Sequence, residues 1–319
     1  MKNNDEVMVS ILVAVYNHEK YLDECLNSIV NQKTNFKYEV LVHDDCSTDN
    51  SKTIIEEYYK KYPDTIIPFY EEENQYSKGV KINIDILIPN IKGKYFCFCE
   101  GDDFWVDENK LQKQFDFLEN NKEYKFCVHN SIKVNKESKK IGKINTLKDG
   151  GDLTCEDFIV GGGAFVATNS MFSYSSLAKN LPEYFNIMSL DYFWQIYLSS
   201  CGKTYCFKDY MSAYRISTEN SWSKRMESNK SKYIQHKEKV IKMLEKINCN
   251  LDYKYDEQFK YIILKDQFSI LKLQREYKKM RKEPYIEIWK KLSLEKKLKY
   301  FFDEHFPEFY GIIKKLLKK

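Results

Sequence analysis

Three carboxylates lie within four residues at Glu100-Gly101-Asp102-Asp103. Carboxylates this close repel one another unless a cation or a basic partner lies among them. Their oxygens suit a hard ion such as Mg²⁺ or Mn²⁺, which proteins hold through one or two carboxylates together with substrate phosphates. Gly101 would let the backbone approach such a ligand closely. The motif therefore predicts a metal site for a phosphorylated substrate, and an acidic turn that caps the next helix is the alternative.

The acidic motif follows Lys94–Cys99, an apolar segment that predicts a buried strand. Two earlier segments of strand length, 9–15 and 38–42, also end in polar residues, at Tyr16-Asn17 and at His43-Asp44-Asp45. Apolar residues at helical spacing separate the strands. This alternation predicts an α/β fold with a mostly parallel sheet and helices on both faces. Because ligands of such sheets bind beyond the carboxyl ends of the strands, the polar segments are expected to line one cleft.

Further elements are expected between these strands. Ser47 and Asp49 are predicted to cap a helix that continues through Tyr59. A third strand is expected at Thr65–Tyr70, and a helix is expected at Ile82–Ile88.

Several classes of protein are disfavoured by what the sequence lacks. It has no apolar run long enough to span a bilayer, and its first residues, MKNNDEVMVS, lack the apolar stretch of a secretory signal, so a cytoplasmic protein is expected. No GxGxxG motif follows the first strand, and Tyr197 replaces the first glycine of a phosphate loop, which disfavours dinucleotide oxidoreductases and phosphate-loop ATPases. The nine cysteines include no CxxC pair, so they are predicted to be reduced core residues.

Charge divides the chain near Ser223. Residues 1–223 contain 25 Lys and Arg against 33 Asp and Glu, whereas residues 224–319 contain 26 against 14. The sequence therefore predicts an acidic domain at 1–223 followed by a basic extension at 224–319. Apolar residues at helical spacing from Ile234 onward predict that the extension is helical.

The end of this extension combines aromatic and aliphatic residues with lysines. It could lie on an anionic lipid surface, and a helical cap or an oligomer contact is the alternative. Nucleic-acid binding is not expected, because no recognised motif accompanies the charge. The residues concerned are Phe301, Phe302, Phe306, Phe309, Tyr310, Ile312, Ile313, Leu316 and Leu317, with Lys314, Lys315, Lys318 and Lys319.

Taken together, these segments resemble the large second family of inverting glycosyltransferases, which have the GT-A fold. The resemblance is carried by VSILVAVYNHEKYLDECLNSIVNQ at 9–32, EVLVHDDCSTDNS at 39–51, KGKYFCFCEGDDFW at 92–105, SLDYFW at 189–194 and MSAYRISTENSWS at 211–223. It implies a nucleotide-binding half at about 1–105 and an acceptor half at about 106–223, and it does not cover the extension.

The resemblance also implies how a nucleotide-sugar donor is bound. Tyr16 and Asp45 would hold the nucleoside, with Asp45 accepting a hydrogen bond from the base, while Asp44 could brace the loop. Glu100 takes the place of the commoner Asp in the family's acidic metal motif, and Asp102 or Asp103 is the expected direct ligand of Mn²⁺ or Mg²⁺. Lys78, Lys81 and Arg215 could neutralise the diphosphate or be solvated charges. The residues expected to bind the donor are Ala14, Tyr16, Asp44, Asp45, Lys78, Lys81, Glu100, Gly101 and Asp102.

Asp191 matches the family's catalytic base, at the start of a helix expected at Tyr192–Ser200. A helix start stabilises negative charge, so proximity to the acceptor hydroxyl would have to supply the catalysis. Capping of that helix is the alternative. Ser217 stands where many relatives have a histidine, which puts a metal or phosphate contact from that position in doubt. The residues expected to form the acceptor and sugar pocket are Trp105, Gly162, Gly163, Thr168, Ser170, Asp191 and Trp222.

The resulting hypothesis is a metal-assisted glycosyltransferase that inverts the anomeric carbon, with a UDP-sugar favoured as donor. The acceptor would be a hydroxyl of a glycan, a lipid-linked sugar or a protein, as in bacterial surface glycan synthesis. A homo-oligomer is compatible with the sequence. Two alternatives stay open: a non-catalytic glycan- or nucleotide-binding module on the same fold, and a nucleotidyltransferase.

Overall fold

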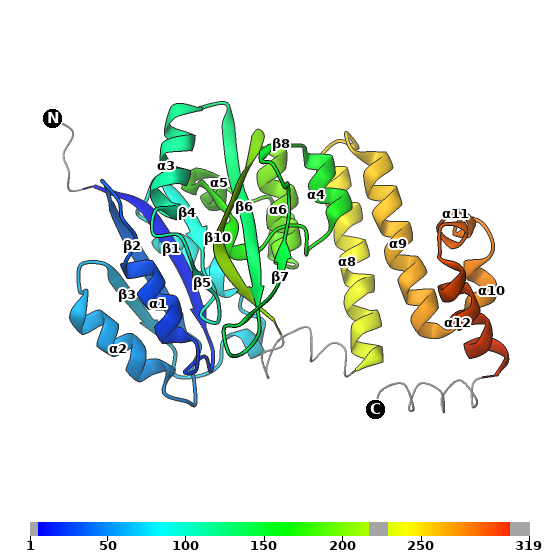
Figure 1. Cartoon of the computed structure of the whole chain (residues 1–319), viewed down its shortest axis with the longest axis horizontal. Coiled ribbons are helices and arrows are strands. Elements are labelled where there is room, and N and C mark those ends of the chain that lie inside the picture. The colour runs from blue at the N-terminus through cyan, green and yellow to red at the C-terminus, as the bar shows by residue number, and fades with distance from the viewer. Residues whose placement is uncertain (1–5, 217–228, 307–319) are drawn as a thin grey trace. The chain divides into compact units, whose positions relative to one another are not determined.

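The computed structural model of the chain describes residues 6–216 and 229–306 (Figure 1). The chain divides into two compact units, Met1–Glu219 and Asn220–Lys319. The predicted boundary at Ser223, the pocket residue Trp222 and the segment after Phe306 lie outside the described residues.

The first unit is built on a single mixed sheet with the strand order β3-β2-β1-β4-β9-β6-β10-β5. Pairing is parallel from β3 to β4 and again between β6 and β10, whereas β9 and β5 pair antiparallel with their neighbours. β7 pairs with β6, and β8 pairs with β10. The strands are β1 Val7–Val15, β2 Lys37–Asp44, β3 Ile66–Tyr70, β4 Tyr95–Phe98, β5 Phe104–Trp105, β6 Tyr124–Val134, β7 Lys140–Ile144, β8 Gly151–Leu153, β9 Phe172–Tyr174 and β10 Lys203–Arg215.

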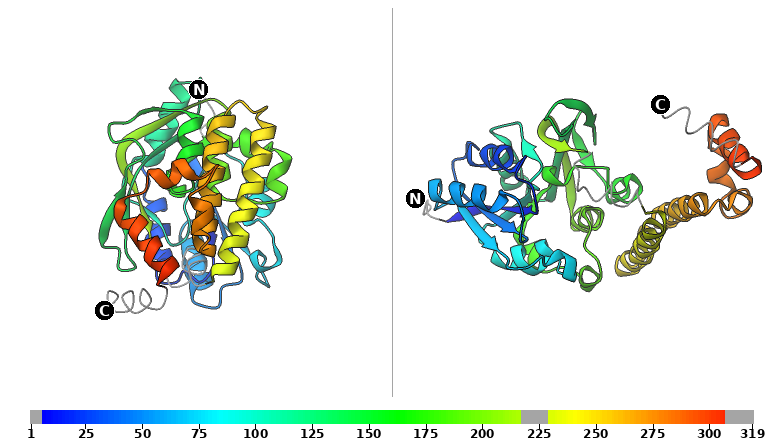
Figure 2. Two further views of the ribbon diagram at one scale, coloured as in Figure 1. Left: turned by 90° about the vertical axis from the view of Figure 1, so that its right-hand side faces the viewer. Right: turned by 90° about the horizontal axis from the view of Figure 1, so that it is seen from below.

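Helices flank this sheet (Figure 2). One core cluster joins the apolar face of α1 to β1, β2 and β4, through buried side chains such as Leu26, Val13, Val42 and Cys97. The α-helices of this unit are α1 Leu22–Val30, α2 Ser51–Lys61, α3 Lys110–Asn120, α4 Cys155–Gly161, α5 Ser175–Lys179 and α6 Asp191–Ser200. The α/β fold predicted from the alternation of strands and helices is confirmed.

Two local predictions are refined by the structure. The helix expected at Ile82–Ile88 is present as a π-helical turn at Ile82–Leu87 followed by a 3₁₀ turn at Ile88–Asn90. Asn50 precedes the first turn of α2 and makes no side-chain capping bond, whereas Asp49 Oδ1 accepts from the Ser51 amide at 3.0 Å, so Asp49 does bind the start of the helix. Ser47 binds the loop after β1 instead, as described below.

The second unit is helical. Its helices are α8 Lys230–Asn250, α9 Asp256–Gln274, α10 Tyr277–Met280, α11 Ile286–Lys290 and α12 Leu294–His305. Helices α8 and α9 pack against each other, and a smaller core gathers Phe268, Tyr277, Met280 and Tyr300. Within residues 6–216 and 229–306, no helix has the length and apolar character needed to cross a membrane.

Candidate functional site

The polar segments after β1, β2 and β4 lie next to one another. In the parallel register Val15 pairs with Asp44, and Leu12 pairs with Phe98. Beyond the strands, the Asp45 amide donates to the carbonyl of Val15 at 3.0 Å, and the Gly101 amide donates to that of Ala14 at 3.2 Å. The expectation that these strand ends share one edge is confirmed, and Ala14 contributes its backbone to that edge.

The loops after β1 and β2 are tied together by hydrogen bonds. The amides of Asn17 and Glu19 donate to Ser47 Oγ at 2.9 Å and to Asp49 Oδ2 at 3.0 Å. In return, the Thr48 amide donates to Asn17 Oδ1 at 2.8 Å. Asn17 has a φ of 56°, a conformation that asparagine tolerates better than most residues. Ser47 and Asp49 therefore hold the loop after β1, which corrects the assignment of Ser47 as a helix cap, while the other oxygen of Asp49 binds the start of α2.

Asp45 makes the loop-bracing contacts that were expected of Asp44. Asp45 is buried, and its two oxygens accept from the amides of Gln75 at 2.6 Å and Tyr76 at 3.1 Å, so it braces the loop after β3. Asp44 is also buried, and its Oδ2 accepts from the Ser47 amide at 3.3 Å. Asp44 Oδ1 has no hydrogen-bond partner among the described residues. The free acceptor at this strand end therefore belongs to Asp44.

The other donor-side candidates differ in their availability. Tyr16 is 40% exposed at the end of β1. Lys78 pairs with Glu73, and Lys81 lies 3.3 Å from Asp85, so each lysine has a carboxylate beside it. Gly101 is required by packing: a Cβ at this position would lie 2.7 Å from His18 Nδ1.

In the acidic motif, the carboxylate of Asp103 accepts hydrogen bonds from the protein, whereas the carboxylates of Glu100 and Asp102 do not. Asp103 is 1% exposed, and its oxygens accept from the Arg215 amide at 2.7 Å and from Asn169 Nδ2 at 2.9 Å. Glu100 and Asp102 are partly exposed, and no described group donates a hydrogen bond to either carboxylate. Asp103 is thus a poor direct metal ligand, contrary to the expectation that put it level with Asp102.

Charge repulsion within the motif fits a divalent cation. Burial raises the pKa of Glu100 well above its usual range, and the charges of Asp191 and Asp102 raise it further. Burial and the charges of Asp102 and Glu100 likewise raise the pKa of Asp103. A cation would relieve this repulsion. No cluster of three or more His, Cys, Asp or Glu in the described part of the chain could hold a metal by itself, so substrate phosphates would have to complete its coordination.

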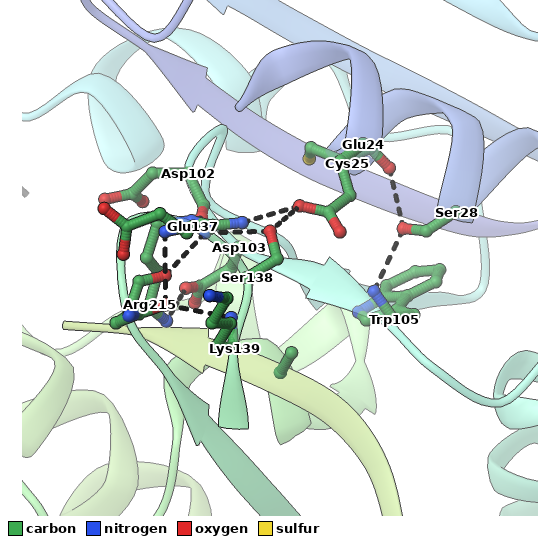
Figure 3. Close-up of polar contacts among 12 residues, drawn as sticks. Glu24, Cys25, Ser28, Asp102, Asp103, Trp105, Glu137, Ser138, Lys139 and Arg215 are labelled. Atoms are coloured by element: carbon green, nitrogen blue, oxygen red, sulfur yellow. Dashed lines mark hydrogen bonds and ion pairs between the residues drawn. The ribbon is translucent and has the colours of Figure 1, made fainter. Parts of the chain in front are cut away.

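Arg215, the last residue of β10, binds the acidic turn through its side chain and its backbone amide (Figure 3). Its side chain is fully buried, and Nε donates to the carbonyl of Asp102 at 2.7 Å. Nη2 donates to Glu24 of α1 at 2.7 Å, and Nη1 donates to the carbonyl of Asn135 at 2.8 Å and to Ser138 Oγ at 3.1 Å. Since these contacts occupy the guanidinium, the expectation that Arg215 neutralises a diphosphate was wrong.

A second buried network supports Asp103. Asn169 donates to Asp103 and to the carbonyl of Ala213, both at 2.9 Å, and accepts from Ser212 Oγ at 2.6 Å. Ser170, expected in the sugar pocket, is fully buried and donates to the carbonyl of Ala167 at 2.6 Å. Thr168 and Ser170 were predicted to line the sugar pocket. Asn169, between them, was not predicted as a site residue, and it supports Asp103 through hydrogen bonds.

Asp191 begins α6 and makes no capping bond with its side chain. Its Oδ2 accepts from Thr168 Oγ1 at 2.6 Å. Burial raises the pKa of Asp191, and the Thr168 hydrogen bond opposes that rise without cancelling it. Helix capping is therefore not its role in this structure, and the expectation that the helix start would keep its pKa low was wrong.

Tyr214 shows that the four carboxylates share one region. Burial raises its pKa, and the charges of Glu100, Asp103, Asp191 and Asp102 raise it further. Each of the four carboxylates is therefore close enough to Tyr214 to act on it electrostatically. Tyr214 was not predicted as a site residue, and neither was Glu24, which resembles an ordinary surface residue of a helix.

The remaining residues predicted to line the pocket differ in their exposure. Gly162 has a φ of 74° and open space around it, and the Gly163 carbonyl accepts from Gln195 at 3.3 Å. Trp105 is 4% exposed, belongs to the core, and has Lys110 Nζ 4.1 Å from its ring centre. Its assignment to the acceptor pocket was wrong, because the strand β5 turns its ring inward.

Comparisons with known proteins agree with this geometry. Residues 10–178 match the family described as Glycosyl transferase family 2. A protein of Mycobacterium tuberculosis named Uncharacterized protein Rv1520 is 29% identical over 218 residues, which cover 67% of this chain and 60% of the relative.

Two solved structures share the fold. The Staphylococcus aureus TarS fragment 1–349, in complex with UDP-GlcNAc, gives a TM-score of 0.59 at 17% identity and covers 93% of this chain and 79% of its own. Mannosyltransferase PcManGT from Pyrobaculum calidifontis, in complex with GDP-Man and Mn²⁺, gives 0.54 at 14% identity and covers 95% and 88%. With its GT-A fold and a family match over more than half of its length, the chain belongs to glycosyl transferase family 2.

Proposed function

We propose that the protein transfers a sugar from a nucleoside diphosphate to an acceptor hydroxyl, with inversion at the anomeric carbon. The observation that carries the proposal is the gathering of Glu100, Asp102 and Asp191 around Tyr214 at the carboxyl edge of the sheet. Such a region can hold a cation with phosphates on one side and a proton acceptor on the other.

A uridine diphosphate sugar is the donor we favour. Asp44 Oδ1 is a buried acceptor without a partner in the described structure, and it could accept the imino N–H of uracil. The partly exposed Tyr16 is available to pack on the base. The fold relatives TarS and PcManGT are described with UDP-GlcNAc and with GDP-Man, so guanosine is the competing base.

We assign the divalent ion, Mn²⁺ or Mg²⁺, to Asp102 with support from Glu100. Both carboxylates are partly exposed and lack donors among the described residues, whereas Asp103 is occupied by Arg215 and Asn169. When bound, such an ion stabilises the negative charge of a leaving diphosphate. Asp103 would keep the turn in place rather than bind the ion.

Asp191 would act as the general base. The acceptor oxygen attacks the anomeric carbon, a new glycosidic bond forms as the bond to the phosphate oxygen breaks, and the proton of the acceptor passes to Asp191. Its raised pKa makes it a better proton acceptor than an exposed aspartate. The Thr168 hydrogen bond engages Oδ2, so Oδ1 would take the proton of the acceptor hydroxyl.

Asp191→Asn and Asp102→Asn test these roles. We expect Asp191→Asn to reduce transfer by about 10²–10⁴-fold while donor affinity changes little. Asp102→Asn should instead weaken Mn²⁺-dependent donor binding, measured by calorimetry with UDP-GlcNAc and related sugars. The exposed residue Asp64, replaced by Asn, serves as control. Near-normal transfer by Asp191→Asn would refute the assignment of the base.

The acceptor we propose is a hydroxyl of a glycan, a lipid-linked sugar or a protein, in the synthesis of a surface glycan. The open backbone around Gly162 and Gly163, close to the start of α6, is where such a hydroxylated ligand could approach. Assaying transfer from a labelled donor to each acceptor class would decide among them.

A further inference from the structure

Helix α12 (Figure 1) exposes most of its large apolar residues, and among its residues only Tyr300 is buried. The exposed fractions are 73% for Leu294, 48% for Leu298, 43% for Phe301, 40% for Phe302 and 52% for Phe306, the residue that follows the helix. Scattered exposed apolar residues are normal, but several on one helix face mark an interaction surface. We call these five residues the α12 face.

The opposite side of α12 fixes this orientation. Tyr300 is buried and stacks on Tyr277 with ring centres 5.4 Å apart. Asp303 lies 3.3 Å from Arg275, and Glu304 pairs with Arg281. Because ion pairs and a stacked tyrosine anchor the inner side, the helix cannot rotate its apolar side inward without breaking them.

The α12 face is continuous. Ring centres are 5.8 Å apart for Phe301 and Phe302, and 6.1 Å apart for Phe302 and Phe306. Leu294 and Leu298 extend the same stripe by one helical turn, since residues four apart lie on one side of a helix.

Unpaired positive charge borders the α12 face. Lys299 is exposed at the edge of the α12 face, Lys296 is exposed one turn earlier, and neither makes an ion pair among the described residues. Glu295 is exposed as well, but the whole extension carries 26 Lys and Arg against 14 Asp and Glu. An apolar helix face in an extension of net positive charge is complementary to negatively charged lipid head groups above acyl chains.

We propose that the α12 face docks on an anionic membrane surface, with the leucines and phenylalanines at the boundary of the acyl chains and the lysines at the head groups. A second copy of the chain fits less well, because face-to-face pairing would bring the same lysines together. The proposal gives a physical surface to the membrane association predicted from the basic extension. It does not depend on the transfer reaction.

The test is co-sedimentation of the full-length protein with vesicles of phosphatidylcholine mixed with phosphatidylglycerol. We expect the wild type to pellet, and Leu298→Ser combined with Phe302→Ser to lower the partition coefficient by at least about tenfold. Tyr261→Ser on α9 is the matched control, because Tyr261 is a 40% exposed aromatic residue away from the α12 face. The control should pellet like the wild type.

Charge provides a second arm. Lys296→Glu with Lys299→Glu, added salt, or vesicles of phosphatidylcholine alone should each weaken pelleting. Equal pelleting by wild type and Leu298→Ser/Phe302→Ser would overturn the proposal. The proposal would also be overturned if the wild type stayed in the supernatant. A dimer that Leu298→Ser/Phe302→Ser dissociates would then identify the α12 face as a contact between two copies of the chain. UDP release from a soluble donor should be unchanged in this double variant, which separates a docking failure from a failure of the proposed function.

Discussion

The carboxylate of Asp103 and those of a second group, Glu100, Asp102 and Asp191, differ in how many of their oxygens receive hydrogen bonds from the protein. Asp103 is buried with both oxygens paired to Arg215 and Asn169. Glu100, Asp102 and Asp191 face a partly open region, and the pKa values of Glu100 and Asp191 are raised. Asp103, the first group, has a donor for each oxygen, whereas the second group, Glu100, Asp102 and Asp191, has carboxylate oxygens without donors, and the charges of Glu100 and Asp102 raise the pKa of Asp103 as well.

The contrast distinguishes a carboxylate that stabilises the fold around the site from carboxylates that could bind a cation. Satisfied buried polar groups stabilise a fold, because removing one partner leaves the other without a bond. Carboxylates held close together without partners cost stability, and a bound cation can relieve that cost. Substitutions in the two groups should therefore change stability in opposite directions.

The largest effect is expected at Arg215. Arg215→Met keeps much of the buried volume but removes the side-chain donor of the Asp102 carbonyl and the charged partner of Glu24, which keeps only its hydrogen bond from Ser138. We expect the free energy of unfolding to fall by about 3 kcal/mol, because the guanidinium is buried and several of its hydrogen bonds are lost, although Glu24 is partly exposed. The midpoint of urea unfolding measures it.

Lys33→Met is the matched control for this substitution. Lys33 also pairs with a glutamate, Glu108, but both side chains are more than half exposed. Its loss should cost less than about 1 kcal/mol. Equal losses for Arg215→Met and Lys33→Met would mean that burial does not distinguish the two pairs.

The opposite sign is expected at Glu100. Glu100→Gln removes a charge that burial and two neighbouring aspartates disfavour. In the presence of a chelator, the variant should be more stable than the wild type by about 0.5–2 kcal/mol, although it loses transfer activity. Thermal unfolding with and without Mn²⁺ measures this, and Glu108→Gln on the surface is the control. Destabilisation by Glu100→Gln would contradict the division into two groups.

Much of the fold could be predicted from the sequence, because apolar strands and helical spacing are local signals. The strands at β1, β2 and β4 and the convergence of their ends follow from such patterns. Glu100 and Asp102 were proposed from the acidic motif and Asp191 from the family resemblance, and their roles stay predictions. The division of labour within the site could not be predicted. Sequence cannot distinguish Asp44 from Asp45, because the difference depends on the amides of Gln75 and Tyr76, about thirty residues away.

Arg215 and Trp105 show the same limit. An arginine near acidic motifs suggests phosphate binding, yet its contacts to Glu24 and Ser138 come from segments 191 and 77 residues away. A tryptophan beside an acidic motif suggests sugar stacking, yet the ring is buried by core packing. Long-range contacts decided both cases, and no local pattern encodes them.

The dependence of the free energy of unfolding on pH should reflect the raised pKa values of Glu100 and Asp191. Folding raises the pKa of Glu100 and Asp191, so the folded state binds more protons than the unfolded state between the usual and the raised values. Stability of the metal-free protein should therefore fall as pH rises above about 4 toward neutrality. Urea unfolding with a chelator across this range measures the slope. The slope should shrink in Glu100→Gln, and an unchanged slope would assign it to other groups.

The smallest effect is expected at Thr168, where the two groups meet. Thr168→Val removes the hydrogen bond to Asp191 with little change in shape, so the pKa of Asp191 should rise further. A general base works when it is deprotonated, so the acidic limb of the pH profile of turnover should move to higher pH. At neutral pH turnover should fall by about tenfold, the cost expected for losing one bond to a charged group. Thr168→Ser keeps the hydroxyl and should restore both the limb and the rate, because only the bond to Asp191, and not the methyl group, sets the proton affinity of that carboxylate.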